Sequence, residues 1–263
     1  METVGRVESL WRYPVKSMRG EALQTLFAGF PGVYGDRVYA FRSSAAPKGF
    51  PYWTGREQPH MLQYGPAYRH RERMVLPPNL AEAEALGSGL TPLYAEADDL
   101  MVDVHTPSGD VLAIDDPRLV ELLREGGRDH LELSLIRSER ALTDCRPISL
   151  ISMHTVRHLS QEVGVELDKM RFRANVYADL SAGAGFFEDA WVGHKLRIGA
   201  KAEIAVIARD SRCKMITLDP DTAQASPDVM RRLSINHDGT AGVYAVVLAE
   251  GAICAGDEIT LLD

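Results

Sequence analysis

Short segments with β-strand character are spread along almost the whole of this 263-residue chain. They are rich in β-branched and aromatic residues, and several alternate apolar with polar positions, as half-buried strands do. These segments are 4–11, 33–42, 131–135, 171–176, 196–198, 204–208, 243–248 and 258–262. Because they do not alternate with helical patterns, a doubly wound parallel sheet is disfavoured. The sequence instead predicts a β-rich α+β fold of antiparallel, barrel-like sheets with a few short helices.

Turn residues predict one hairpin and one long loop. The segment Thr-Pro-Ser-Gly-Asp at 106–110 separates the apolar segments 100–104 and 111–114, which is typical of a β-hairpin. Residues 46–59 contain repeated prolines and glycines. Proline has no N–H to donate to a strand ladder, so we expect a loop there, long enough to carry a function.

Capping residues predict a short helix near the middle of the chain. Asp116 is a favourable N-cap, Pro117 suits the first helical position, and Gly126 follows the apolar face. We expect this helix to bridge two lobes and to lie beside their boundary. The expected domains are residues 1–125, a β-barrel-like domain, and residues 126–263, a second barrel-like domain.

Two more helices are expected in the second half, one beginning near Ser152 and one at 226–228. The apolar stripe of the first consists of Met153, Val156, Leu159 and Val163. A stripe at this spacing faces a core. We therefore interpret His154 and His158 as exposed or hydrogen-bonded helix residues and assign them no function.

Composition limits the possible partners and compartments. The formal net charge of -8 argues against a nucleic-acid partner, which favours a basic surface. Cys145, Cys213 and Cys254 are few, odd in number and widely spaced, which fits a reducing compartment better than a disulfide framework. The chain has neither a leader pattern nor an apolar run approaching ~20 residues, so we expect a cytoplasmic protein without membrane contact.

Cys213 is the most distinctive residue for function. It follows an apolar strand and lies among Arg209, Arg212 and Lys214, whose positive charges would favour a thiolate. Two interpretations stay open at this point: a ligand or nucleophile, or a small buried hydrophobic residue. Cys254, by contrast, lies in an apolar strand and turn, which favours packing.

A second motif supports the functional interpretation of Cys213. Residues 7–20 form a strand that leads into a basic turn containing Lys16 and Ser17, and such a turn suits an anion. With 209–217 and the following 218–222, this motif resembles the MOSC domain family, the molybdenum cofactor sulfurase C-terminal domain and its relatives, over nearly the whole chain. Residues 1–125 then correspond to the N-terminal MOSC-associated β-barrel domain and residues 126–263 to the MOSC domain.

The resemblance, which is closest to the amidoxime-reducing molybdenum proteins, implies a molybdenum cofactor and assigns its contacts. The cofactor phosphate is assigned to Lys16, Ser17 and Arg37. The pterin contacts are assigned to Asp144, Arg146, Arg173, Asn175, Ser211, Arg212 and Tyr244. Cys213 is assigned as the metal ligand and catalytic residue, since soft sulfur ligation suits this metal.

Simpler roles remain open for several of these residues. Lys16 and Arg37 also fit ordinary surface charges, and Asp144 fits an Asx turn. Asn175 also fits a turn and Tyr244 a core position with a paired hydroxyl. The sequence departs from the family pattern at two positions, with Ala174 in place of a proline and Met18 where a cysteine is frequent.

Arg56 has two open interpretations. It either closes the 46–59 loop over the site or lies exposed to solvent.

The resemblance implies an oxidoreductase that reduces N-hydroxylated or N-oxide substrates by oxygen-atom transfer at a Cys-ligated molybdenum. Since 1–263 contains no cysteine-rich, ferredoxin-like segment, we expect electrons from a separate donor protein, of ferredoxin or flavoprotein type. The alternative is a sulfur carrier with a persulfide on Cys213, for cofactor or metal-sulfur assembly. A third interpretation is a pterin-binding module without catalysis, in which Cys213 is dispensable.

Overall fold

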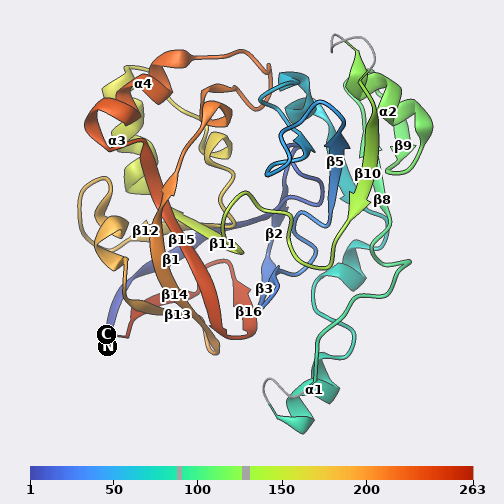
Figure 1. The fold of residues 1–263 in the computed structure, drawn as a ribbon. Coiled ribbons are helices and arrows are strands. Elements are labelled where there is room, and N and C mark those ends of the chain that lie inside the picture. Colours follow the sequence, from blue (N-terminus) through green and yellow to red (C-terminus); the bar gives the residue numbers. More distant parts are fainter. Residues whose placement is uncertain (88–90, 126–130, 263) are drawn as a thin grey trace.

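The computed structural model describes residues 1–87, 91–125 and 131–262. Seven strands of this part of the chain form a ring: β1 (Glu2–Arg12), β11 (Ile148–Ser152), β12 (Val176–Leu180), β13 (Lys195–Ile198), β14 (Ala202–Ser211), β15 (Thr240–Ala249) and β17 (Glu258–Leu261). Around the ring the order is β12, β11, β15, β14, β13, β17 and β1, and β1 pairs with β12 to close the barrel (Figure 1). The predicted β-rich, barrel-like fold is confirmed, although β11 and β12 are parallel.

The barrel is filled by the inward-facing positions of these strands. Alternating apolar residues converge on one core, which includes Leu10, Leu150, Val176, Leu196, Ile204, Val243 and Ile259. Because side chains alternate between the two faces of a strand, the period-two pattern of the sequence produces this core directly. The two termini lie side by side at one end of the barrel, where Glu2 pairs with Leu261.

Three smaller sheets complete the strand inventory of the described residues. One contains β5 (Tyr39–Ser43), β6 (Tyr52–Trp53) and β10 (Leu133–Arg137), and another contains β7 (Gly65–Tyr68), β8 (Val102–His105) and β9 (Val111–Ala113). The third contains β3 (Thr25–Gly29), β4 (Gly32–Val33) and β16 (Gly251–Cys254), while β2 (Glu21–Leu23) extends the barrel sheet beside β1. The predicted hairpin is therefore β8 and β9.

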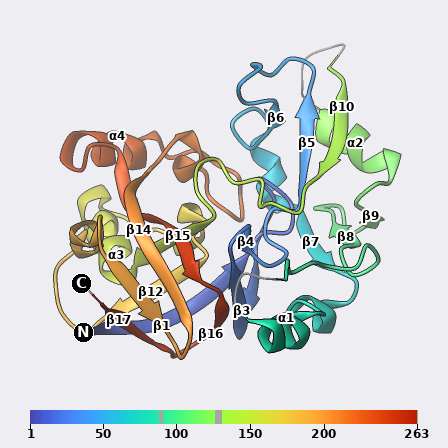
Figure 2. The same cartoon turned by 60° about the horizontal axis from the view of Figure 1, so that its bottom comes forward.

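The four α-helices of the described chain are α1 (Leu80–Leu86), α2 (Pro117–Arg124), α3 (Met153–Val163) and α4 (Pro227–Asn236). The predicted caps are confirmed, since Asp116 accepts a hydrogen bond from the Arg118 N–H and Ser152 from the Thr155 N–H. The expected terminator Gly126 lies outside the described residues. Helices α3 and α4 lie beside each other on the outer face of the barrel (Figures 1 and 2), over a core that includes Val156 and Leu233.

Short 3-10 helices occupy several connections: η1 (Pro59–Gln63), η2 (Arg71–Met74), η3 (Lys169–Phe172), η4 (Phe187–Trp191) and η5 (Lys214–Thr217). No helix in the described ranges is long and apolar enough to cross a membrane.

Two predicted strands are wrong in part, and both errors occur at residues that line the cavity described below. The expected strand 33–42 is interrupted between β4 and β5, where Arg37 has a φ of 46°. In the expected strand 171–176, η3 and a left-handed Arg173 with φ of 52° precede β12, which begins only at Val176. A left-handed backbone cannot continue a strand ladder. At Arg37 the bond from its N–H to the Tyr13 carbonyl, at 2.7 Å, overrides local strand propensity.

The expected division of the chain at residue 125 stays a prediction. Strands from both sides of it join common sheets, because β1 closes the barrel of the second half and β10 pairs with β5. Helix α2 buries Leu119 and Leu123 in the core of the N-terminal sheets. The two halves are thus interlocked, because each contributes a strand to a sheet of the other, and they are not joined by one linker alone.

Candidate functional site

One cavity of about 110 Å³ lies between the turn after β1 and the ends of the barrel strands. Its lining includes all eleven residues that the sequence assigned to the site: Lys16, Ser17, Arg37, Asp144, Arg146, Arg173, Asn175, Ser211, Arg212, Cys213 and Tyr244. These residues come from segments as far apart along the sequence as Lys16 and Tyr244. The fold therefore brings the two motifs together at one cavity.

Three non-glycine residues with a left-handed backbone lie around this cavity. Their φ angles are 66° at Ser17, 46° at Arg37 and 52° at Arg173. Such conformations are uncommon away from glycine and concentrate at functional sites, where surrounding bonds hold them. Here they turn the chain sharply at the point where each side chain enters the cavity wall.

Two largely buried guanidinium groups stack on one tyrosine. The Arg37 and Arg173 guanidinium carbons lie 4.5 and 4.4 Å from the centre of the Tyr13 ring. Arg37 donates to the Arg173 carbonyl at 2.9 Å and pairs with the Asp36 carboxylate, and Arg173 donates to the Met18 carbonyl at 2.7 Å. Each cation is thereby held in place by an aromatic face and a backbone acceptor.

Arg173 has unused binding capacity. Its Nη2 is buried and has no hydrogen-bond partner among the described residues. Burial, and next the charge of Arg37, lowers the pKa of Arg173 to about 10. Asp36 compensates the charge of Arg37, whereas the unpaired Nη2 of Arg173 is unfavourable unless an acceptor reaches it. Arg173 is therefore the guanidinium of this pair with a free donor for a ligand.

Lys16 supplies a third buried cation. Its Nζ donates to the Leu142 carbonyl at 2.7 Å, pairs with the Asp144 carboxylate, and lies 4.8 Å from the centre of the Tyr52 ring. Burial acts to raise the pKa of Asp144, but the Lys16 charge and hydrogen bond hold it below the ordinary value. In this structure the negative charge of Asp144 therefore pairs with the Lys16 ammonium group.

Cys213 lies between the end of β14 and the start of η5, and it is partly buried. Arg56 of the 46–59 loop is its electrostatic neighbour. Burial acts to lower the pKa of Arg56, but the interaction with the neighbouring Cys213 raises that pKa overall. Arg56 also donates to Asp144 at 2.8 Å, and Lys214 donates to the Arg56 carbonyl at 2.8 Å. Of the two interpretations of Arg56, the structure supports closure of the loop over the site.

Two assigned residues use their polar atoms inside the protein. Arg212 donates to the Ala241 carbonyl at 2.8 and 2.6 Å, and pairs with Asp210 at 2.7 Å. The Asn175 amide donates to the Trp11 carbonyl at 3.2 Å and accepts from a backbone N–H at 3.3 Å. These bonds shape the cavity wall and leave less capacity for a ligand.

The three remaining assigned residues differ in burial. Ser211 and Arg146 are exposed at the rim of the cavity. Tyr244 is partly buried, and burial followed by the neighbouring Asp210 charge raises its pKa.

Sequence reasoning missed three residues that support the site. Tyr13 is the platform for both arginines, Asp36 accepts from the Tyr13 N–H at 2.8 Å, and the buried Asp210 accepts from the Ser149 hydroxyl at 2.8 Å. The available signal was the pairing of aspartate with arginine in Asp36-Arg37 and in Asp210-Ser211-Arg212. The expectation for Cys254 was wrong, because this residue is exposed.

Fold and site together define a class: an interlocked, two-part β-barrel protein with a cavity between the parts that is lined by cationic side chains and one free thiol. Residues 4–117 match the MOSC N-terminal beta barrel domain, and residues 137–260 match the MOSC domain. The chain belongs to the MOSC domain family.

Individual relatives are distant. The chain is similar to mitochondrial amidoxime reducing component 2 of Bos taurus, with 26% identity over 243 residues, covering 84% of this chain and 69% of that protein. Among solved structures, the YuaD protein of Bacillus subtilis aligns with a TM-score of 0.49 and 14% identity over 98% of this chain and 96% of that one. YiiM of Geobacillus stearothermophilus aligns with a TM-score of 0.36 and 20% identity over 45% of this chain and 55% of that one.

Proposed function

We propose that this protein is a molybdenum-cofactor-binding oxidoreductase that reduces N-hydroxylated or N-oxide substrates, with electrons from a separate donor protein. Membership of the MOSC domain family and similarity to an amidoxime reducing component support this proposal. The observation that carries it is the presence of the free Cys213 thiol and the incompletely bonded Arg173 guanidinium in one cavity.

The donor set fits the cofactor. A molybdenum pterin cofactor requires cations for its phosphate, polar groups for the pterin edges and a soft ligand for its metal. Lys16, Arg37 and Arg173 are cations, and Cys213 is a thiol. The buried, unpartnered Nη2 of Arg173 is the specific observation that fits an anionic ligand at this site.

Each residue then has a defined task. Lys16, Ser17 and Arg37 would bind the phosphate, and Arg173, which the sequence assigned to the pterin, is placed by its contact with Tyr13 to join them. Tyr13 would hold the two guanidinium groups in orientation. Cys213 would ligate the metal, and the cofactor would supply oxygen-atom-transfer chemistry when bound. Arg56 covers the thiol and limits the access of water.

Loading requires a change of partner at Lys16. The cavity of about 110 Å³ is smaller than the several hundred Å³ typical of ligand sites, and Asp144 pairs with Lys16 at its mouth. Lys16 would exchange the Asp144 carboxylate for the cofactor phosphate, one charge-assisted bond for another. Asp144 would then be able to accept from the pterin edge.

A second candidate function is sulfur transfer through a Cys213 persulfide. It is favoured by the partial exposure of this free thiol beside Arg56. The three cysteines described are all free, which supports a reducing compartment, and we propose a cytoplasmic location.

The direct test is reduction of benzamidoxime by cofactor-loaded protein with a chemically reduced viologen as the electron donor. We expect turnover by the wild type, loss of at least ~100-fold in Cys213→Ser, and little change in Cys254→Ser, whose side chain is exposed and lies in β16. Equal losses in both variants, without unfolding, would contradict the assignment of Cys213. A wild type that is inactive yet carries a persulfide would favour the sulfur carrier.

A further inference from the structure

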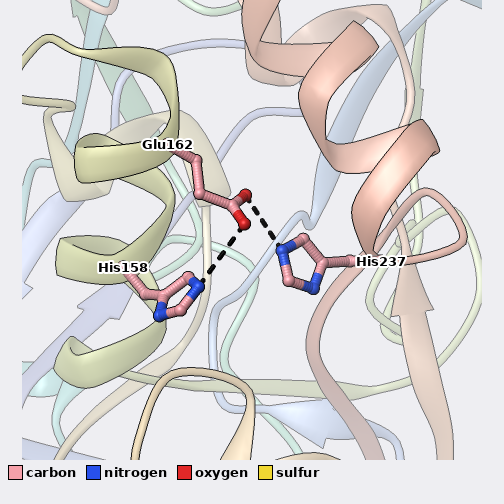
Figure 3. A group of neighbouring side chains, drawn as sticks. All are labelled: His158, Glu162 and His237. Atoms are coloured by element: carbon pink, nitrogen blue, oxygen red, sulfur yellow. Dashed lines mark hydrogen bonds and ion pairs between the residues drawn. The ribbon is translucent and has the colours of Figure 1, made fainter.

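A second group of ligand-type side chains lies on the outer face of the barrel. His158 and Glu162 are on α3, and His237 follows the last residue of α4 (Figure 3). One nitrogen or oxygen from each residue lies within 4.8 Å of the others. None of the three lines the cavity that contains Cys213. The group is therefore separate from the proposed cofactor site.

The helical geometry explains how two of the three side chains meet. Residues four apart lie one turn above each other on the same face of a helix, so His158 and Glu162 project together. Their closest ligand atoms, Nε2 and Oε1, are 3.4 Å apart. His237 approaches from the other helix, with its Nε2 2.9 Å from Glu162 Oε2. Both imidazoles thus converge on one carboxylate, as Figure 3 shows.

These separations are close to those of a zinc coordination shell. Ligand atoms about 2.0–2.1 Å from a tetrahedral zinc ion are about 3.3–3.4 Å from each other. His158 lies at 3.4 Å from Glu162 Oε1 and His237 at 2.9 Å from Glu162 Oε2, and one ligand atom from each of the three residues lies within 4.8 Å of the other two. Two histidines and one glutamate form a common set of three protein ligands for zinc, with water in the fourth position.

The group is oriented by neighbours that are not ligands. The His237 ring stacks on Phe186, with centroids 3.6 Å apart and planes 12° from parallel. The Asn236 amide donates to Glu162 Oε1 at 3.1 Å. His158 meets the edge of Phe186 and keeps 41% of its side chain exposed, which leaves a path for an ion from solvent. Outer contacts that fix ligand orientation are typical of metal sites.

We propose that His158, Glu162 and His237 bind a divalent transition metal ion, of which zinc fits the donor set best. The ion ties the end of α4 to α3. The turn after His237 also carries the Gly239 carbonyl, which accepts from the Arg212 N–H at 2.9 Å. A metal at this position therefore stabilises the same backbone turn that supports the residue before Cys213. This inference does not depend on the proposed function.

Metal-free full-length protein, prepared by chelation without molybdenum cofactor, provides the test. We expect one zinc ion per chain after addition of ZnCl2 and dialysis, together with a higher melting temperature. His158→Gln and Glu162→Gln are expected to weaken zinc binding at least 10-fold. His154→Gln, one turn earlier on α3, is the matched control and is expected to bind like the wild type.

The exposed cysteines are the main competing ligands, and cobalt separates them from the histidines. Cobalt bound to thiolate gives an intense near-ultraviolet charge-transfer band, whereas cobalt on imidazole and carboxylate gives only weak visible bands. We expect the weak bands alone at one equivalent of CoCl2. A charge-transfer band, or zinc binding that survives in both His158→Gln and Glu162→Gln, would overturn the proposal. Absence of binding by the folded wild type would leave a hydrogen-bonded His-Glu-His group and would also overturn it.

Discussion

The Arg56 guanidinium donates to the Asp144 carboxylate at 2.8 Å, and this ion pair joins the 46–59 loop to the mouth of the Cys213 cavity. The same carboxylate pairs with Lys16, so a single negative charge is shared by the loop and the buried cation. Lys214 holds the loop at a second point through the Arg56 carbonyl. Asp144 therefore links closure of the loop to Lys16, and in the proposed function it links closure to phosphate binding as well.

We expect Arg56→Ala to loosen the 46–59 loop without unfolding the protein. The ion pair is partly exposed, so its loss costs only about 0–1 kcal/mol of folding free energy. Limited proteolysis is the measurement, and cleavage within 46–59 is expected to become several-fold faster. Lys48→Ala changes an exposed residue of the same loop and serves as the control. Equal cleavage rates in the wild type and Arg56→Ala would show that this ion pair does not hold the loop.

Inorganic phosphate is expected to raise the melting temperature of the cofactor-free protein. It supplies acceptors for the unpartnered Arg173 Nη2 and neutralises the adjacent guanidinium groups. Arg173→Gln is expected to lose most of this gain, measured as the shift in melting temperature between phosphate and chloride at equal ionic strength. Arg69→Gln removes an exposed arginine from the N-terminal sheets and should respond like the wild type. A full phosphate response in Arg173→Gln would place the anion elsewhere.

Asp189 is expected to make stability fall as the pH rises from about 4 to about 6. Burial, and next the charge of Glu188, raises the pKa of Asp189 to about 6, and its Oδ1 is buried without a partner. A carboxyl group whose folded-state pKa is raised stabilises the protein below its unfolded value near 4. That contribution is lost as the pH passes the folded value.

We therefore expect Asp189→Asn to melt at a higher temperature than the wild type at pH 7.5 and to flatten the slope between pH 4 and 6. Asp238→Asn removes the more exposed carboxylate that pairs with the same Arg209, and it is the matched control. Melting curves across this pH range measure both effects. An unchanged slope in Asp189→Asn would assign the titration to another group.

Gly5→Ala tests the closure of the barrel between β1 and β12. A Cβ at Gly5 would lie 2.5 Å from the Asp179 carbonyl oxygen, which is backbone and cannot rotate away. We expect a loss of about 1–3 kcal/mol in the free energy of unfolding, as for other overpacked positions. Gly49→Ala meets no atom within 4 Å and should stay within about 0.5 kcal/mol. Denaturant unfolding measures the stability of both variants. Equal stabilities would contradict the close packing of β1 against β12 at Gly5.

Local patterns predicted the strands and the helix caps because they depend on nearest neighbours. Asp116 and Ser152 cap their helices as their residue types indicate, and the alternation of Ile204 and Val206 places both in the barrel core. Pairings between distant segments were not predictable. No pattern in residues 2–12 indicates that this first strand closes a barrel whose other strands come from the second half of the chain.

The site residues were found through family resemblance, but their arrangement required the structure. Strand propensity predicted extended backbone at Arg37 and Arg173, where the structure has left-handed turns. Those turns are held by tertiary contacts, such as the bond from the Arg37 Nη2 to the Arg173 carbonyl. The role of Tyr13 between two cations is likewise a property of three segments that meet only in the fold.

The most direct test of the central claim is the molybdenum content of protein purified from a host that makes molybdenum cofactor. Mass spectrometric elemental analysis should find close to one molybdenum per chain in the wild type. In Cys213→Ser the content should fall at least ~10-fold, because the metal loses its protein thiolate. Cys254→Ser should keep the wild-type content. Well-folded wild-type protein without molybdenum, or undiminished metal in Cys213→Ser, would contradict the account.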